Sequence, residues 1–368
     1  MKKHKRKLSI LATGADIKSR FCVFKDGEIF VSQAFGNLEN PDNFRRFKDE
    51  FFSKKIKPDI VAYDLHPAYF SSRFAIDLKA PKGIAVQHHH AHIASMMFEK
   101  NIKHKVIGVA FDGTGYGSDG NFWGGEFLCV DAGGFRRIAH FDYMKLPGGE
   151  AAITEPWRIA FSILYSFFGE EVFKEDLWLL RILSRKNYRI IIKMLENNIN
   201  TILTSSVGRL FDAVSSILWI CKKINFEAQP AIKLEKAATK NRDNEAYDFD
   251  IIEKSKLFII GYKNLFRGII LDLKKSVSKE VIARRFHNSL ANLIDTMLKK
   301  IYEREKVKDV ILSGGVFQNR LLYGLVEKKI KESGFNLLGS QKMPVNDLGI
   351  CYGQLYVALN GNNPFNVF

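Results

Sequence analysis

The chain has 368 residues, which is long enough for two domains or for one bilobal domain with sizeable cores. Hydrophobic residues make up 46% of the chain and charged residues 26%, proportions that are ordinary for a soluble globular protein. The formal net charge of +16 favours acidic partners such as nucleotides, nucleic acid or an acidic protein face. Because the lysines are spread along the chain, apart from a basic run at residues 1–7, we interpret the charge as a lysine-rich surface and disfavour nucleic acid as a partner.

The cysteine spacing and the hydropathy exclude further classes. The four cysteines are far apart and form no C-x2-C pair, which excludes zinc fingers: they are Cys22, Cys129, Cys221 and Cys351. Three of them lie in apolar runs, so we expect them to be buried free thiols. Free thiols fit a protein of the reducing cytoplasm. No apolar stretch reaches the length of a membrane-spanning helix, and the basic start lacks the apolar region of a signal peptide. We therefore expect a cytoplasmic protein with no membrane partner.

The first part of the chain predicts a mixed α/β arrangement. Residues 8–33 contain three strands, and the Asp-Gly step at residues 26–27 between two apolar runs is a strong hairpin signal. Further elements follow in the order helix, strand, helix, strand and helix, at residues 37–54, 58–66, 69–78, 83–87 and 88–100.

The same order begins a second time after residue 105. Three strands are predicted at residues 106–112, 121–133 and 135–144. The repetition indicates an internal duplication and a bilobal nucleotide-binding fold with a cleft between the lobes.

The remainder is predominantly helical in its pattern. From Glu155 to about Lys300, apolar residues recur at helical spacing. A strand, a glycine turn and a helix are then predicted within residues 308–322, followed by a short strand at 335–340 and a last helix within 344–359.

The sequence contains a run of histidines at residues 88–92. His88 and His92 are four residues apart, so on a helix they share one face and can hold one metal ion. Asp112 is predicted to end a strand and to start a glycine turn with Gly113 and Thr114, where backbone N–H groups can approach an anion. Together they form a candidate metal–phosphate site. From the spacing alone, a solvated helix start and a plain hairpin turn remain open as an alternative.

Other polar positions allow a nucleotide site or a purely structural role. The turn at Gly314–Gly315 lies between a strand and a helix, where N–H groups can face a phosphate or ribose. Asp212 is flanked by apolar residues and is either a helix surface position or a ribose ligand, and Glu227 could reach the same cleft. Glu150 and Arg158 could form a structural ion pair. Walker A and G-x-S-x-G motifs are absent, which excludes a P-loop protein and an α/β-hydrolase nucleophile.

Four motifs in order, QHHHAHIAS, VAFDGTGYGSDG, FWGGEFL and LPGGEAAITEPWR, resemble the hydrogenase-maturation carbamoyltransferase family of HypF type. The resemblance is to the C-terminal domain of that family and runs from Leu8 to about Leu359. It implies two RNase-H-like lobes of the actin-like ATPase and sugar-kinase superfamily, with a helical insertion. The expected division is residues 1–105 with the C-terminal segment 345–368 as one lobe, and residues 106–344 with an insertion at 155–300 as the other.

The resemblance also implies site residues. A divalent metal, iron or zinc with magnesium as an alternative, is expected on His88, His92, Asp112 and Asp347, and Asp112 is expected to serve catalysis through that metal. An adenine nucleotide (ATP, AMP or carbamoyl-adenylate) is expected on Gly208, Asp212, Gly314, Gly315, Asn319 and Glu227. The assignment of Glu227 is weaker because EAQ stands where the family usually has EGQ or EGE.

The implied reaction moves a carbamoyl group from carbamoyl-adenylate to the C-terminal cysteine of a HypE-type maturation protein. The acylphosphatase, zinc-finger and carbamoyl-adenylate-forming regions of the family do not occur in this sequence, which predicts a split gene product or an excised domain. Carbamoyl-adenylate is then expected from a separate domain or protein.

Two further functions remain open on the same fold. One is a tRNA threonylcarbamoyl transferase or an O-carbamoyltransferase, and the other is a non-catalytic nucleotide-binding scaffold. QHHHAH together with EPWR and GRLFDAV favours the hydrogenase-maturation family over the tRNA threonylcarbamoyl transferase.

Overall fold

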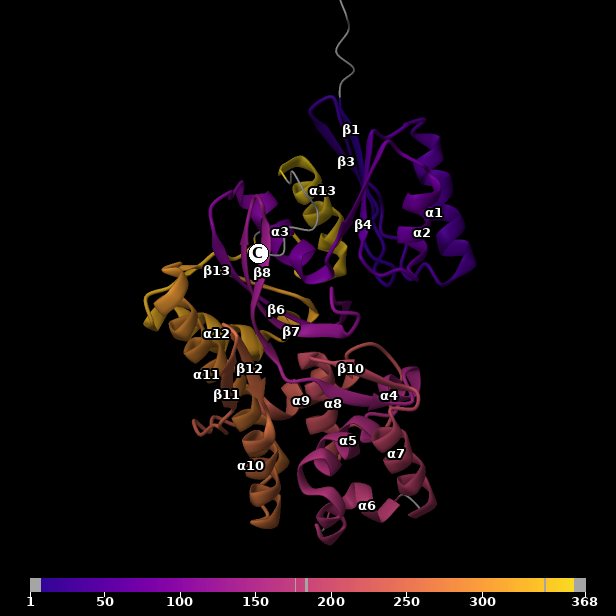
Figure 1. Cartoon of the computed structure of the whole chain (residues 1–368). Coiled ribbons are helices and arrows are strands. Elements are labelled where there is room, and N and C mark those ends of the chain that lie inside the picture. The colour runs from indigo at the N-terminus through magenta and orange to yellow at the C-terminus, as the bar shows by residue number, and fades with distance from the viewer. Residues whose placement is uncertain (1–7, 176, 183–184, 341, 361–368) are drawn as a thin grey trace, which may run out of the picture.

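The computed structural model describes residues 8–175, 177–182, 185–340 and 342–360 (Figure 1). The basic run at residues 1–7 and the end of the predicted C-terminal segment, residues 361–368, lie outside this part of the chain. Within the described residues, no helix combines the length and the apolar character that a bilayer span requires.

The first sheet has five strands in the order β3-β2-β1-β4-β5. They are β1 (Ser9–Ala12), β2 (Cys22–Lys25), β3 (Glu28–Val31), β4 (Ile60–Asp64) and β5 (Lys82–Val86). The first three are antiparallel neighbours, whereas β4 and β5 run parallel to β1. The predicted hairpin turn is confirmed, because Asp26 and Gly27 both have positive φ, 58° and 89°.

The two faces of this sheet pack against different helices. Alternate residues of β1 point to opposite sides, since side chains alternate along a strand. Leu11 joins Phe47 of α1 (Pro41–Ser53) and Phe74 of α2 (Phe70–Asp77) in one cluster. Ile10 instead faces α3 (His88–Lys100) and α13 (Ile350–Asn360). Figure 1 shows α3 and α13 side by side between the two sheets.

The second sheet repeats the arrangement of the first. Its path is β11-β12-β8-β7-β6-β13-β14, and β9 and β10 pair off this path. The strands are β6 (Val106–Tyr116), β7 (Phe122–Asp131), β8 (Gly134–Phe141), β9 (Met144–Pro147), β10 (Thr201–Thr204), β11 (Asp250–Lys254), β12 (Leu257–Gly261), β13 (Asp309–Ser313) and β14 (Asn336–Leu337). Within it, β8-β7-β6-β13-β14 has the same two antiparallel and two parallel pairings as the five-stranded sheet. The predicted internal duplication is therefore confirmed.

Helices fill much of the predicted insertion and the C-terminal part. They are α4 (Glu150–Thr154), α5 (Trp157–Phe168), η1 (Gly169–Lys174), α6 (Trp178–Ile182), α7 (Arg185–Asn197), α8 (Val207–Ile217), α9 (Gln229–Ala238), α10 (Lys263–Lys274), α11 (Lys279–Glu305), η2 (Gly315–Gln318), α12 (Arg320–Glu332) and η3 (Asp347–Gly349). In Figure 1, α4 to α7 lie on the far side of the second sheet from the first sheet.

The stretch from Glu155 to Lys300 is predominantly helical, as predicted, but the strands β10, β11 and β12 within it were not predicted. The β11–β12 hairpin turns at Ser255 and Lys256, which have φ of 49° and 70°. Such turns normally carry asparagine or glycine, so the usual sequence signal for a hairpin is missing here.

Candidate metal centre

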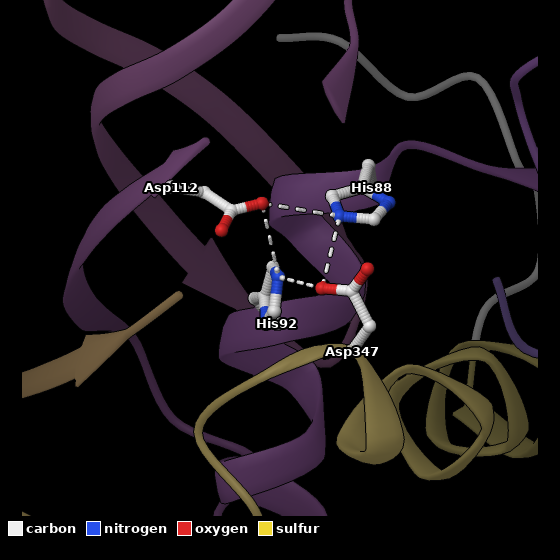
Figure 2. Close-up of side chains that lie close together, drawn as sticks. All are labelled: His88, His92, Asp112 and Asp347. Atoms are coloured by element: carbon white, nitrogen blue, oxygen red, sulfur yellow. Dashed lines mark ion pairs between the residues drawn. The ribbon is translucent and has the colours of Figure 1, made fainter. Parts of the chain in front are cut away.

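Two histidines and two aspartates from distant parts of the chain meet at the N-terminal end of α3. Each offers one ligand atom, and the four atoms lie within 4.8 Å of one another: they belong to His88, His92, Asp112 and Asp347. Figure 2 shows both imidazole rings and both carboxylates directed toward one point. The histidines come from α3, Asp112 from β6 and Asp347 from η3. The fold thus gathers the four residues of the predicted metal site.

The histidine pair is positioned by the first turns of α3. Gln87 caps this helix, because its side-chain oxygen accepts a hydrogen bond from the backbone N–H of His90 at 2.9 Å. His88 and His92 then lie one turn apart, with ring centroids separated by 5.0 Å. Both side chains are completely buried. The alternative of a solvated helix start is therefore wrong.

Asp112 does not end its strand as expected. Strand β6 continues to Tyr116, and the pairing with β7 shifts between Phe111 and Gly115. Phe111 faces Gly125 and Gly115 faces Trp123, so residues 112–114 bulge opposite a single residue. The bulge re-aims the Asp112 side chain toward α3, which is why a plain hairpin turn is also the wrong interpretation.

The glycine turn before η2 holds both aspartates in place. The Gly315 N–H donates to Asp112 Oδ1 at 2.9 Å, which leaves Oδ2 facing the histidines. The Gly314 N–H donates to the carbonyl of Val345 at 2.9 Å, two residues before Asp347. These donors were expected to face a nucleotide phosphate, but both are engaged inside the protein.

The geometry leaves room for a cation between the four groups. His88 Nε2 lies 3.5 Å from Asp112 Oδ2 and 3.8 Å from Asp347 Oδ1, and for His92 Nε2 these distances are 3.7 and 3.6 Å. Both Nε2 atoms are buried and have no hydrogen-bond partner in the part of the chain that the structure describes. Ligand atoms that each lie about 2.1 Å from one ion stand roughly 3–3.5 Å apart, close to this spacing. Two imidazoles and two carboxylates therefore fit a divalent transition metal.

The charges of the cluster are strongly coupled. Burial alone would lower the pKa of His88, but the carboxylates of Asp64, Asp112 and Asp347 outweigh it and raise that pKa well above the usual range. Burial works against ionisation of Asp112, yet the proximity of the two histidines holds its pKa well below normal. Burial and the neighbouring Asp112 raise the pKa of Asp347. A cation in the centre would place positive charge between these two carboxylates.

Part of the expected nucleotide site gathers beside this centre, at the start of α8. A Cβ atom on Gly208 would stand 2.8 Å from the Cα of Gly113, so the helix packs directly on the β6 bulge. Asp212 is 1% exposed on the same helix and pairs with Arg209 at 3.0 Å, which excludes a surface position. Burial raises the pKa of Asp212 to about 6, although Arg209 opposes the shift. Thr114 adjoins Gly113, and its hydroxyl donates to the carbonyl of Gly113 at 2.6 Å.

Two of the expected nucleotide residues have other partners. Glu227 is exposed and forms an ion pair with Lys18 at 2.6 Å. Asn319 caps α12 by accepting from the Leu322 N–H at 2.9 Å, and its amide nitrogen lies 2.9 Å from His287 Nε2. Both side chains are therefore engaged by residues other than Asp212.

The structure also shows the partner of Arg158 and the state of the cysteines. Arg158 pairs with Glu155 at 2.5 Å and not with Glu150. All four cysteines are buried, and burial together with Glu305 raises the pKa of the Cys129 thiol to about 11. A thiol in that state is a poor nucleophile.

Sequence reasoning missed three polar residues near the centre. Asp64 contacts His88 at 2.7 Å, Arg209 pairs with Asp212, and Lys18 lies close enough to Asp347 to lower its pKa. Asp64 carried one usable signal, because an acidic residue at the end of a buried parallel strand lies where α/β folds bind ligands. For Arg209 and Lys18, the sequence offered no signal of a role in the site beyond their charge.

Comparison with known families gives matches along nearly the whole chain. The family model described as "Carbamoyltransferase, Kae1-like Domain, second subdomain" matches residues 108–354, and the "HypF Kae1-like domain" model matches residues 5–99. The carbamoyltransferase HypF of Synechocystis sp. is 35% identical over 363 residues, which cover 94% of this chain and 46% of that protein. A carbamoyltransferase HypF homolog of Cupriavidus necator is 30% identical over 364 residues, covering 95% of this chain and 91% of that protein.

Solved structures agree with these matches. A full-length HypF solved in a phosphate- and nucleotide-bound form has a TM-score of 0.89 and 37% identity, covering 96% of this chain and 56% of that one. HypF from T. kodakarensis has a TM-score of 0.84 and 31% identity, covering 96% of this chain and 48% of that one. The chain thus spans about half the length of most of these relatives. The likeness and the two mixed sheets confirm the predicted α/β fold class.

Proposed function

Because this chain belongs to the HypF family of carbamoyltransferases, we propose that it transfers carbamoyl from carbamoyl-adenylate to the C-terminal cysteine of a HypE-type hydrogenase-maturation protein. A carbamoyl-adenylate-forming domain or protein supplies the donor. The observation that carries the proposal is the cluster of His88, His92, Asp112 and Asp347, in which the two buried imidazole Nε2 atoms have no hydrogen-bond partner among the described residues. The cytoplasm is the compartment that we propose, because the four cysteines are buried thiols.

The two histidines and two aspartates would hold a divalent metal, with iron(II) or zinc as the preferred ions and magnesium as an alternative. Such an ion polarises a carbonyl or phosphoryl oxygen and stabilises negative charge that develops on it. The protein supplies the rigidity: Asp112 is fixed by the Gly315 N–H, and Asp347 follows the segment anchored to Gly314. Asp112 serves the reaction through this ion.

An adenine nucleotide is proposed beside the centre, at the start of α8. Asp212 is buried, and its Oδ2 is held by the ion pair with Arg209 Nη2 at 3.0 Å without a well-aligned hydrogen bond, so we propose this oxygen as the acceptor of a ribose hydroxyl. The Nε of Arg209 is also buried without a partner, so this side chain can turn a donor toward a phosphate. Gly113, Thr114 and Gly208 are proposed to line this region, whereas Gly314, Gly315, Asn319 and Glu227 are weaker members because of their other partners.

The transfer forms one bond and breaks one. The thiolate sulfur of the acceptor attacks the carbamoyl carbon and a C–S bond forms. The bond between that carbon and the phosphate oxygen breaks, and AMP leaves with the electron pair. The thiol proton goes to solvent before the attack. The residues of this chain need only hold the donor and shield it, since the nucleophile comes from the partner.

The lobes are proposed to divide as the sequence suggests. Residues 1–105 with the segment from 345 onward would form one lobe, and residues 106–344, including the insertion at 155–300, the other. The support is the repeated five-strand order and the packing of α13 against α3 and β4.

The test supplies carbamoyl-adenylate and a HypE-type partner to the purified chain and follows the partner's C-terminal peptide by mass spectrometry. We expect a carbamoyl adduct on the terminal cysteine with the unmodified chain, and none with Asp112→Asn. If the cysteine stays unmodified with the unmodified chain as well as with Asp112→Asn, the proposal is contradicted. A non-catalytic nucleotide-binding scaffold is then the remaining interpretation. Modification of tRNA in a parallel reaction would instead indicate a threonylcarbamoyl transferase.

A further inference from the structure

We propose that Asp64 is a positioning residue of the metal centre, which fixes His88 in the form that presents Nε2 to a cation. Asp64 is absent from the set of residues that the sequence or the family resemblance assigns to the site. The inference rests on the metal centre proposed above, and it concerns a residue that does not touch the ion itself.

The contact between the Asp64 and His88 side chains is short, and both side chains are buried. Asp64 Oδ2 lies 2.7 Å from His88 Nδ1, and neither side chain is exposed to solvent. This length is typical of a charge-assisted hydrogen bond. An ionised carboxylate can only accept, so Nδ1 of His88 must carry the proton. In the neutral ring, the lone pair then lies on Nε2, the atom that faces Asp112 and Asp347.

The fold holds the Asp64 carboxylate rigidly for this purpose. Its other oxygen, Oδ1, accepts from the His66 N–H at 2.9 Å, and its backbone carbonyl accepts from the Ser72 hydroxyl at 2.8 Å. Asp64 ends β4 and is paired in register with Val86 of β5, directly before the cap of α3. The register of β4 with β5 therefore places the Asp64 carboxylate next to His88, the first residue of α3.

Among the described residues, the second histidine has no carboxylate partner on Nδ1 comparable to Asp64. His92 Nδ1 faces only the hydroxyl of Ser313, at 3.5 Å, the outer limit of a hydrogen bond. An anionic partner makes an imidazole a stronger metal ligand, whereas a distant hydroxyl does little. We therefore infer that the two imidazoles are unequal ligands, and that His88 is the one whose strength and orientation the first sheet controls.

Asp64→Asn tests this, because asparagine keeps the shape and removes the negative charge. Zinc affinity of the full chain would be measured by competition with a chelator of known affinity. We expect the variant to bind zinc about 10- to 100-fold more weakly, the usual effect of losing such a partner.

Asp16→Asn is the matched control. Asp16 is a buried carboxylate near Asp64 that accepts from the Phe70 and Ser71 N–H groups at 2.7 and 2.9 Å. The control removes the same charge from the same region without touching His88. A loss of affinity in Asp16→Asn as large as in Asp64→Asn would mean that general charge, and not the hydrogen bond, is responsible.

A second measurement needs no variant. In nitrogen-15 NMR of the metal-free protein at neutral pH, we expect the His88 ring to carry a hydrogen-bonded proton on Nδ1. A ring protonated on Nε2 alone would overturn the proposal. If the unmodified chain binds no zinc, the metal centre itself is wrong; if it binds zinc and Asp64→Asn binds equally tightly, only the role of Asp64 is wrong.

Discussion

Gly353 of α13 lies directly against Ala91 of α3, so closely that a Cβ atom on Gly353 would stand 1.9 Å from the Ala91 carbonyl oxygen. Ala91 lies between the two histidines of the metal centre, and α13 follows immediately after η3, which carries Asp347. The approach of these two backbones therefore sets how near Asp347 comes to the histidines.

Gly353→Ala should push the two helices apart. We expect a loss of about 1–3 kcal/mol in the free energy of unfolding from overpacking, together with weaker zinc binding. Gly324→Ala in α12 is the matched control, because nothing lies within 4 Å of a Cβ atom there. That control should stabilise the protein by about 0.5–1 kcal/mol. Urea unfolding and chelator competition measure both effects, and undisturbed zinc affinity in Gly353→Ala would contradict the link.

Removing both imidazoles should empty the metal centre. We expect His88→Ala combined with His92→Ala to leave no stoichiometric iron or zinc in elemental analysis of the purified protein, since two carboxylates alone hold such ions weakly. His90→Gln is the control: His90 is buried on the same helix but does not belong to the cluster. A metal content in the double variant equal to that of the control would place the ion elsewhere.

Asp212→Ala should weaken the binding of AMP or ATP. The loss of a buried hydrogen bond to a ribose hydroxyl costs about 1–3 kcal/mol, which calorimetry would detect as at least a several-fold weaker affinity. Asp243→Ala, in the loop before β11, controls for the loss of an ion-paired carboxylate elsewhere in the chain. An unchanged affinity in Asp212→Ala would mean that the ribose is held by other residues.

The stability of the protein should fall as the pH drops below about 6.5, and His287 contributes to this. His287 is fully buried, its Nδ1 lies 2.7 Å from the Ala283 carbonyl, and burial lowers its pKa to about 4. Between these values the unfolded chain binds more protons than the folded one, so the free energy of unfolding rises with pH across the window. A shift from about 6.5 to about 4 corresponds to roughly 3 kcal/mol.

His287→Gln removes this titration and should flatten the stability profile between pH 7 and pH 4 by up to about 3 kcal/mol. Denaturant unfolding at several pH values provides the measurement. His104→Gln serves as the control, because His104 is 62% exposed. Parallel profiles for the unmodified protein and His287→Gln would show that His287 takes up its proton without unfolding.

Local signals in the sequence were sufficient for most single elements. The helix at residues 88–100 was predicted with its observed bounds, because its cap, its spacing and its end all lie within the segment itself. The Asp26–Gly27 hairpin followed in the same way. The β11–β12 hairpin did not, since Ser255 and Lys256 take up positive φ without the residues that favour it.

The composition of the metal centre was implied by family resemblance, but its geometry was decided by the tertiary structure. The spacing of His88 and His92 is fixed by one helical turn, which the sequence determines. Asp112 reaches them only because β6 bulges against β7, and Asp347 only because α13 packs against α3. The hydrogen bond of Asp64 to His88 depends on the register of β4 with β5. Strand register and helix packing are set by contacts between residues far apart in the chain, and no local pattern of residue types encodes them.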